Sequence, residues 1–331
     1  MRWQTEPRVR AALLSVAVSM LLLGLKLAGW AWTGSSAIFS DALESVTNVV
    51  AAAFGLGALL FSVQPVDEGH PYGHGKIEFV SAAFEGGMIT FAALLSAGYA
   101  LLDLWRGPEV EQVALGLGIT TLAALVNACL GALLLAEGRR LRSPALVADG
   151  HHVLTDVQTS IGVFVGLGLV AFTGRRWCDP VAALVVALNL GWIGARIVRE
   201  ALGGLLDAVD PALVRRIVAA FESCRRPGLL QIHQPRLIRS GPLTHVDVHI
   251  TVPEFWTVEE IHGLLGELAR EVLARSALEG DLAVHFDPCR RELCACCEMA
   301  GCPVRVAPFV ARLPLDHAGG NVARGEAGAR P

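Results

Sequence analysis

The chain has 331 residues, of which 53% are hydrophobic and only 18% are charged, and its mean hydropathy is +0.51. This balance excludes an ordinary soluble enzyme and is typical of a membrane domain that carries a polar appendage. The formal net charge of −4 argues against a nucleic acid as the partner.

Six apolar stretches are long enough to cross a lipid bilayer, which takes about 20 residues of helix. They cover approximately residues 11–32, 37–63, 79–105, 113–136, 145–172 and 180–198. An even number of spans places both termini on the same side. Arginine and lysine gather at the N-terminus and in the loops after the even-numbered spans, so the positive-inside rule predicts cytoplasmic termini in a bacterial inner membrane.

Two of these stretches carry polar side chains that suit a metal site. His152 and Asp156 lie one helical turn apart in the fifth stretch, and Glu44 and Asn48 have the same spacing in the second. Ionisable groups inside a membrane cost about 2.5–3.5 kcal/mol each on insertion scales and are functional candidates by default. Polar contacts between helices are the alternative, but they explain poorly why a carboxylate and an imidazole share one helical face.

Three further ionisable residues lie in or beside the apolar stretches. We expect Lys26, inside the first stretch, to extend toward the outer interface, with an ion pair as the alternative. We expect Glu78 to remain at the interface beside Lys76. No role follows from the sequence for Glu85, which lies deeper in the third stretch.

The segment after the second stretch contains Asp67, His70 and His74 among several glycines. Imidazole and carboxylate groups at this spacing, on a backbone that can turn tightly, suit a small metal-binding loop. A solvated histidine-rich turn is the alternative, and the residue types alone do not separate the two.

From residue 207 to residue 288 the composition is that of a soluble domain. Helical spacing covers residues 211–224 and 258–275, and strand-like runs cover residues 229–238, 243–252 and 282–286. The order αββαβ predicts a compact α+β domain with helices on one face of a sheet. Alternation in the second run places His245, Asp247 and His249 on the face opposite its valines.

Five of the eight cysteines lie between residues 289 and 302. Such clustering is typical of a metal knuckle in a reducing compartment rather than of a disulfide framework. Four regularly spaced thiols could hold zinc tetrahedrally, with isolated buried cysteines as the alternative. They are Cys289, Cys294, Cys297 and Cys302. The remainder, residues 303–331, becomes rich in Gly, Ala and Arg and is predicted to be a disordered tail.

Five motifs along the chain are specific when taken together: Gly34-Ser35…Ser40-Asp41-Ala42, His70-Pro-Tyr-Gly-His74-Gly-Lys76-Ile-Glu78, Asp149-x-x-His152-x-x-x-Asp156, Asp179-Pro180 and His285-Phe-Asp287-Pro288. Over about residues 10–290 the chain resembles the cation diffusion facilitator family of divalent metal/proton antiporters. The resemblance implies six membrane helices, a ferredoxin-like cytoplasmic domain and a homodimer.

The resemblance also implies three sites. In the transport site His152 and Asp156 face Glu44 and Asn48, but the family usually has an aspartate where Asn48 stands, so this site is less anionic. The loop site consists of Asp67, His70 and His74. The cytoplasmic site at the dimer interface takes its ligands from the following residues: His233, His249, His262, His285 and Asp287.

The function expected from these features is efflux of a divalent cation from the cytoplasm in exchange for protons. Zinc suits one imidazole with oxygen ligands, and iron, cobalt and manganese are alternatives. Because Asn48 cannot carry charge, a membrane-bound metal sensor or partner subunit without transport activity is the alternative function. No enzyme activity is expected, and the absence of a His-Glu-x-x-His sequence argues against an intramembrane metallopeptidase.

Overall fold

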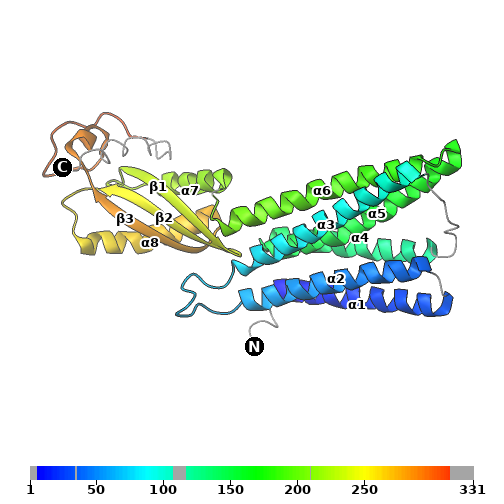
Figure 1. The fold of residues 1–331 in the computed structure, drawn as a ribbon. Helices are drawn as coiled ribbons and strands as arrows, with labels where there is room; N and C mark the ends of the chain where they lie inside the picture. Colours follow the sequence, from blue (N-terminus) through cyan, green and yellow to red (C-terminus); the bar gives the residue numbers. More distant parts are fainter. Residues whose placement is uncertain (1–5, 34–35, 107–116, 209, 314–331) are drawn as a thin grey trace, which may run out of the picture. The chain divides into compact units, whose positions relative to one another are not determined.

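The computed structural model describes residues 6–33, 36–106, 117–208 and 210–313. The chain divides into two compact units, Met1–Leu206 and Asp207–Pro331. Within the described residues the first unit contains long helices and the second contains a small sheet with two helices against it (Figure 1).

The first unit is a helical bundle. Its elements are α1 Pro7–Thr33, α2 Ser36–Ser62, α3 Ile77–Arg106, α4 Leu117–Arg140, α5 Pro144–Thr173 and α6 Cys178–Leu205. In the described part of the chain six helices are long and apolar enough to cross a membrane, which confirms the spans predicted from hydropathy. The predicted start of the fourth span, near residue 113, lies outside the described residues.

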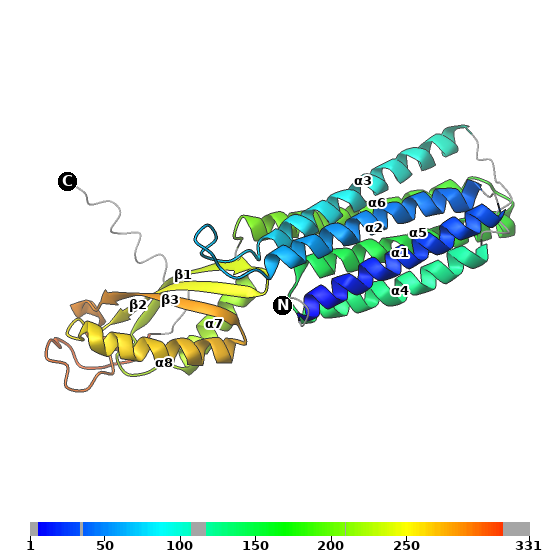
Figure 2. The same ribbon diagram turned by 90° about the horizontal axis from the view of Figure 1, so that it is seen from below.

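Neighbouring helices in the bundle are not simply consecutive in sequence. α3 packs along α6, α4 along α5, and α1 along α2, as the views in Figures 1 and 2 show. A Cβ added to Gly86 would lie 3.0 Å from Gly194 O, and one added to Gly194 would lie 2.8 Å from Gly86 O. The absence of side chains at both positions therefore allows the close approach of α3 and α6.

The carboxylate of Glu78 joins four helices at one end of the bundle. Arg8 Nη1 of α1 lies 2.6 Å from Glu78 Oε1, and Ser62 Oγ of α2 donates to the same oxygen at 3.3 Å. Ser143 Oγ, at the N-cap of α5, donates to Oε2. Glu78, in the first turn of α3, is 0% exposed. Burial is tolerated because a cation and hydroxyl donors from other helices satisfy the carboxylate.

The second unit is α+β, as the order of its elements predicted. It contains α7 Pro211–Ser223, β1 Gln231–Ser240, β2 Leu243–Val252, α8 Val258–Ser276 and β3 Glu279–Pro288. β2 is the central strand, antiparallel to β1 and parallel to β3. The parallel pair requires a crossover connection, which α8 supplies.

Both helices of this unit pack on one face of the sheet. Phe221 of α7, Leu268 of α8 and Val248 of β2 belong to one apolar core, in which each is at most 1% exposed. Burial alternates along the first part of β2, with Val246 and Ile250 also in the core, and this confirms the alternation predicted for residues 243–252. The opposite face of the sheet carries polar side chains.

α8 begins with a reciprocal capping arrangement. Thr257 Oγ1 accepts from Glu260 N at 3.2 Å, and Glu260 Oε2 accepts from Thr257 N at 2.8 Å. These bonds satisfy two backbone donors that the first helical turn leaves without partners.

The segment after β3 folds back on itself around a short 3₁₀ turn, Arg291–Cys296. Val310 N donates to Ala295 O at 2.7 Å, and Arg225 Nη1 of the sheet unit donates to Leu313 O at 2.6 Å. The predicted disordered tail, residues 303–331, is therefore wrong for residues 303–313. The rest of that segment, residues 314–331, lies outside the described residues.

The buried pair of Arg8 and Glu78 gives a stability prediction. We expect Arg8→Ala to lower the free energy of unfolding by about 3–5 kcal/mol, because it leaves a buried carboxylate without its cation. Thermal unfolding of the detergent-solubilised chain measures the change. Arg140→Ala is the control, since Arg140 is largely exposed and such surface pairs contribute about 0–1 kcal/mol. Equal stability of the two variants would contradict the prediction.

Candidate metal-binding sites

Polar side chains of α2 and α5 meet inside the bundle. Asn48 of α2 contacts both residues of α5 that were predicted as ligands: His152 Nε2 donates to Asn48 Oδ1 at 3.1 Å, and Asn48 Nδ2 donates to Asp156 Oδ2. His152 is 7% exposed, so the amide supplies a hydrogen-bond partner that a buried imidazole needs. The structure thus brings three of the four residues predicted for this site into direct contact.

Glu44, the fourth of these residues, shares a cavity with Asp156. The cavity measures about 30 Å³, which is enough for a water molecule or a single ion. Its polar walls come from α1, α2, α4 and α5 and consist of Lys26, Glu44, Asn127, Asp156, Thr159 and Ser160. We refer to it as the α2–α5 cavity.

Four polar residues of the α2–α5 cavity were not predicted to belong to it: Lys26, Asn127, Thr159 and Ser160. Asn127 Nδ2 of α4 lies 3.5 Å from Asp156 Oδ2, and the signal that could have found it is an amide inside an apolar stretch. Lys26 is 6% exposed and its Nζ donates to Ser45 Oγ at 2.8 Å. The expectation that Lys26 extends to the outer interface is therefore wrong, and its ammonium instead contributes positive charge to the cavity wall.

Glu85, for which the sequence indicated no role, is completely buried on α3. Ser81 Oγ donates to Glu85 Oε1 at 3.4 Å. Gly55 of α2 lies opposite, and a Cβ added there would stand 3.2 Å from the same oxygen. Glu85 does not line the α2–α5 cavity.

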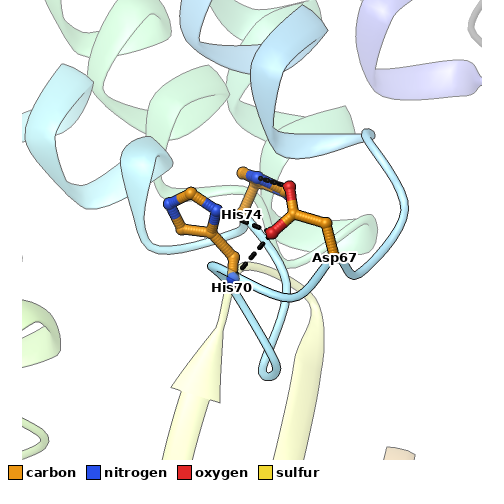
Figure 3. Close-up of side chains that lie close together, drawn as sticks. All are labelled: Asp67, His70 and His74. Atoms are coloured by element: carbon orange, nitrogen blue, oxygen red, sulfur yellow. Dashed lines mark hydrogen bonds and ion pairs between the residues drawn. The ribbon is translucent and has the colours of Figure 1, made fainter.

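The loop between α2 and α3 gathers Asp67, His70 and His74 (Figure 3). Asp67 Oδ1 lies 3.0 Å from His70 Nδ1, and Asp67 Oδ2 lies 3.3 Å from His74 Nε2. Gly73 has a φ of +77°, a left-handed conformation that lets the loop turn between the two histidines. One ligand atom from each of the three residues lies within 4.8 Å of the others, as a shared metal ion requires.

The two histidines of this loop have different surroundings. The His74 side chain is 2% exposed and packs edge-on against Phe61 with ring centroids 4.7 Å apart, whereas the His70 side chain is 53% exposed. The hydrogen bond from His70 lowers the pKa of Asp67, which keeps that carboxylate in its anionic, cation-binding form at lower pH.

Histidines from all three strands lie side by side on the open face of the sheet. His233 of β1 is paired in register with His249 of β2, which is paired with His285 of β3. Asp287 is central to this histidine cluster: its Oδ2 lies 3.0 Å from His233 Nε2 and 3.1 Å from His249 Nδ1. Its Oδ1 lies 3.5 Å from His285 Nε2. Burial lowers the pKa of His233, which favours the neutral imidazole that binds metals.

Two other histidines of the sheet unit lie apart from this cluster. His262 is exposed on α8, and α8 packs through Leu268 and Val272 against the other face of the sheet. Within one chain the structure therefore separates His262 from the other four ligands predicted for the cytoplasmic site. His245, on the same face of β2 as His249, pairs instead with Asp281.

The cysteines after β3 surround a second, smaller cavity. The four that line it are those with regular spacing: Cys289, Cys294, Cys297 and Cys302. Among the described residues, three His, Cys, Asp or Glu ligand atoms come within 4.8 Å of one another only in the loop and in the histidine cluster. The thiols that line this cavity are therefore farther apart than the ligand atoms of the loop and of the histidine cluster.

Each of the two units of the chain matches a known protein family model. The family model of the cation efflux transmembrane domain matches residues 12–206, and that of the cytoplasmic domain of cation efflux proteins matches residues 209–289. An uncharacterized transporter from Synechocystis sp. is 35% identical over 279 residues, which cover 84% of this chain and 89% of the relative. The cation-efflux pump FieF of Salmonella arizonae is 27% identical over 280 residues, or 85% and 92% of the two chains.

The matches cover the membrane helices and the sheet unit but end at residue 289, before most of the cysteine segment. The transmembrane match alone spans more than half of the chain. The resemblance recognised in the sequence motifs is thereby confirmed. The chain belongs to the cation diffusion facilitator, or cation efflux, family: it is a multi-pass membrane transporter of divalent cations with a cytoplasmic dimerisation domain.

Proposed function

We propose that this protein exports zinc from the cytoplasm in exchange for protons, as a homodimer in a bacterial inner membrane with both termini cytoplasmic. The observation that carries the proposal is the contact of Asn48 with both His152 and Asp156 between two membrane helices. Ionisable groups held at this depth mark ion pathways, and family membership supports a cation as the transported species.

Glu44 and Asp156 line the α2–α5 cavity, Asn48 bonds Asp156 and His152 bonds Asn48, and together these ligand atoms support a small divalent cation. A metal ion would replace the hydrogen bonds of the Asn48 amide, and His152 would lose its Nε2 proton to become a ligand. Asn48 Oδ1 then serves as a neutral oxygen ligand beside the carboxylates of Asp156 and Glu44. This mixture of one imidazole and several oxygens suits Zn²⁺, and Fe²⁺, Co²⁺ and Mn²⁺ accept similar ligands.

The charges around the cavity support exchange with protons. Glu44 and Asp156 supply two negative charges, while Lys26 on the same wall supplies a positive one that opposes a bound cation. The ion therefore requires both carboxylates to be ionised and the imidazole of His152 to be neutral. Protons that enter from the outer side neutralise the carboxylates and charge the imidazole, and the ion leaves.

The loop group and the histidine cluster fit a regulatory role for the same metal. The cluster lies on the face of the sheet that α7 and α8 leave open, where a second chain has access to it. A bound ion stabilises whichever arrangement of the two chains it contacts more, so occupancy of the cluster would tighten the dimer. Rising cytoplasmic metal would in this way act on the transporter that removes it.

The first test removes the charge of Asp156. Loss of a residue that only supports a metal ligand typically lowers metal affinity or activity about 10–100-fold. Because Asp156 would itself be a ligand, we expect Asp156→Asn to reduce zinc uptake by inside-out vesicles by more than this. Asp103→Asn is the control, because Asp103 is exposed near the end of α3 and lies away from the cavity. Normal uptake by the Asp156 variant would contradict the site. Zinc binding without zinc-dependent proton flux in proteoliposomes of the unmodified chain would instead establish the sensor alternative.

The second test concerns the amide. Asn48→Asp adds a carboxylate that must be ionised beside Asp156, so we expect uptake to fall more steeply with acid and metal preference to change. The pH profile of zinc, iron, cobalt and manganese uptake measures both effects. Asn189→Asp is the matched control, since Asn189 of α6 hydrogen-bonds Gln158 at 2.9 Å and does not line the cavity. An unaltered profile for Asn48→Asp would show that Asn48 does not contact the ion.

The third test addresses regulation. In the full-length chain labelled for energy transfer between the two cytoplasmic domains, we expect zinc to bring the domains together and His249→Ala to abolish the response. His245→Ala is the control, because His245 occupies the same face of β2 but pairs with Asp281 outside the cluster. Identical zinc responses of the two variants would rule out the histidine cluster as the regulatory site.

A further inference from the structure

The cysteines after β3 differ in whether they line the small cavity of this segment. Four thiols line it, whereas Cys296, in the middle of the same segment, does not. Two of the four, Cys294 and Cys297, are 7% and 8% exposed. The cavity measures about 10 Å³, close to one water-sized sphere and therefore suited to a single ion. The four lining residues are those whose spacing predicted a tetrahedral set.

Hydrogen bonds that do not involve the thiols hold this segment in place. Cys297 N donates to Cys294 O at 3.3 Å, which closes a turn between two of the ligands. The guanidinium of Arg305 donates to the same two residues, to Cys297 O at 2.8 Å and Cys294 O at 3.2 Å. Cys289 N donates to Val252 O at 2.8 Å and so ties the segment to the end of β2. These bonds anchor the backbone that carries the four thiols.

Charge also favours a metal with thiolate ligands. Four thiolates around a divalent ion leave a net charge of about −2, and the side chains of Arg290 and Arg305 line the same cavity. Leu230, Pro253 and Val304 supply apolar walls on other sides of the cavity. Thiolates are soft ligands that select zinc over magnesium, calcium or manganese.

We propose that Cys289, Cys294, Cys297 and Cys302 bind one structural zinc ion, a site separate from the transport pathway. Zn–S bonds of about 2.3 Å require the four sulfurs to draw together around the ion. Zinc binding thus closes this knuckle next to the C-terminal end of β3. Because β3 is an edge strand that pairs only with β2 in the described sheet, the closed knuckle fixes the strand that carries His285 and Asp287.

Zinc content tests this proposal. The full-length chain is purified in detergent under reducing conditions, washed with a weak chelator and analysed by mass spectrometry of its metals. We expect the double variant Cys294→Ser/Cys297→Ser to retain about one zinc ion fewer per chain than the unmodified protein. Cys296→Ser should retain the full amount, since Cys296 does not line the cavity. Equal zinc in all three proteins overturns the proposal.

A second measurement uses the unmodified chain and so does not depend on the folding of a variant. X-ray absorption at the zinc edge should show sulfur neighbours at about 2.3 Å. Only nitrogen and oxygen neighbours, or disulfides found by mass measurement without reductant, overturn the proposal. Neither readout involves transport, so failure here and failure of the proposed efflux function are distinguishable.

Discussion

The amide of Asn48 is the contact on which the proposed transport site depends. The imidazole of buried His152 and the half-buried carboxylate of Asp156 both need partners, and the amide accepts from one while donating to the other. An ionised aspartate at this position could only accept, which would leave Asp156 facing a like charge. The amide of Asn48 thus gives His152 Nε2 and Asp156 Oδ2 a partner each, and in the proposed transport site a metal ion would replace both hydrogen bonds.

The need of buried polar and charged groups for partners also applies to the rest of the bundle. Glu78 is buried because Arg8 and two serines reach it from other helices, and Lys26 is buried with a bond to Ser45. Each of these contacts joins helices that are also held by apolar packing, so charge satisfaction and helix arrangement support each other. Lys26 also lines the α2–α5 cavity, so its charge bears on the protonation states that the proposed metal binding requires.

In the sheet unit, the two-residue period of β-strands places the apolar core on one face of the sheet and the candidate metal ligands on the other. Apolar residues of β2 face α7 and α8, while His249 faces the open side beside His233 and His285. Parallel pairing of β2 with β3 places Asp287 where it reaches all three imidazoles. The cysteine segment begins at residue 289, directly after β3, so the chain connects the proposed zinc knuckle to the strand that carries His285 and Asp287.

The sequence by itself determined the six membrane helices, the αββαβ order and the ligand pairs one helical turn apart, because length, hydropathy and periodicity are local properties of the chain. The predicted pairing of Asn48 with α5 also appears in the structure. Only the tertiary structure decided that Arg8 meets Glu78, that Lys26 and Asn127 enter the α2–α5 cavity, and that His262 lies apart from its expected partners. These outcomes depend on which helices are neighbours and on how each is rotated about its axis. Packing between residues distant in sequence sets both, and the period of a single helix does not specify either.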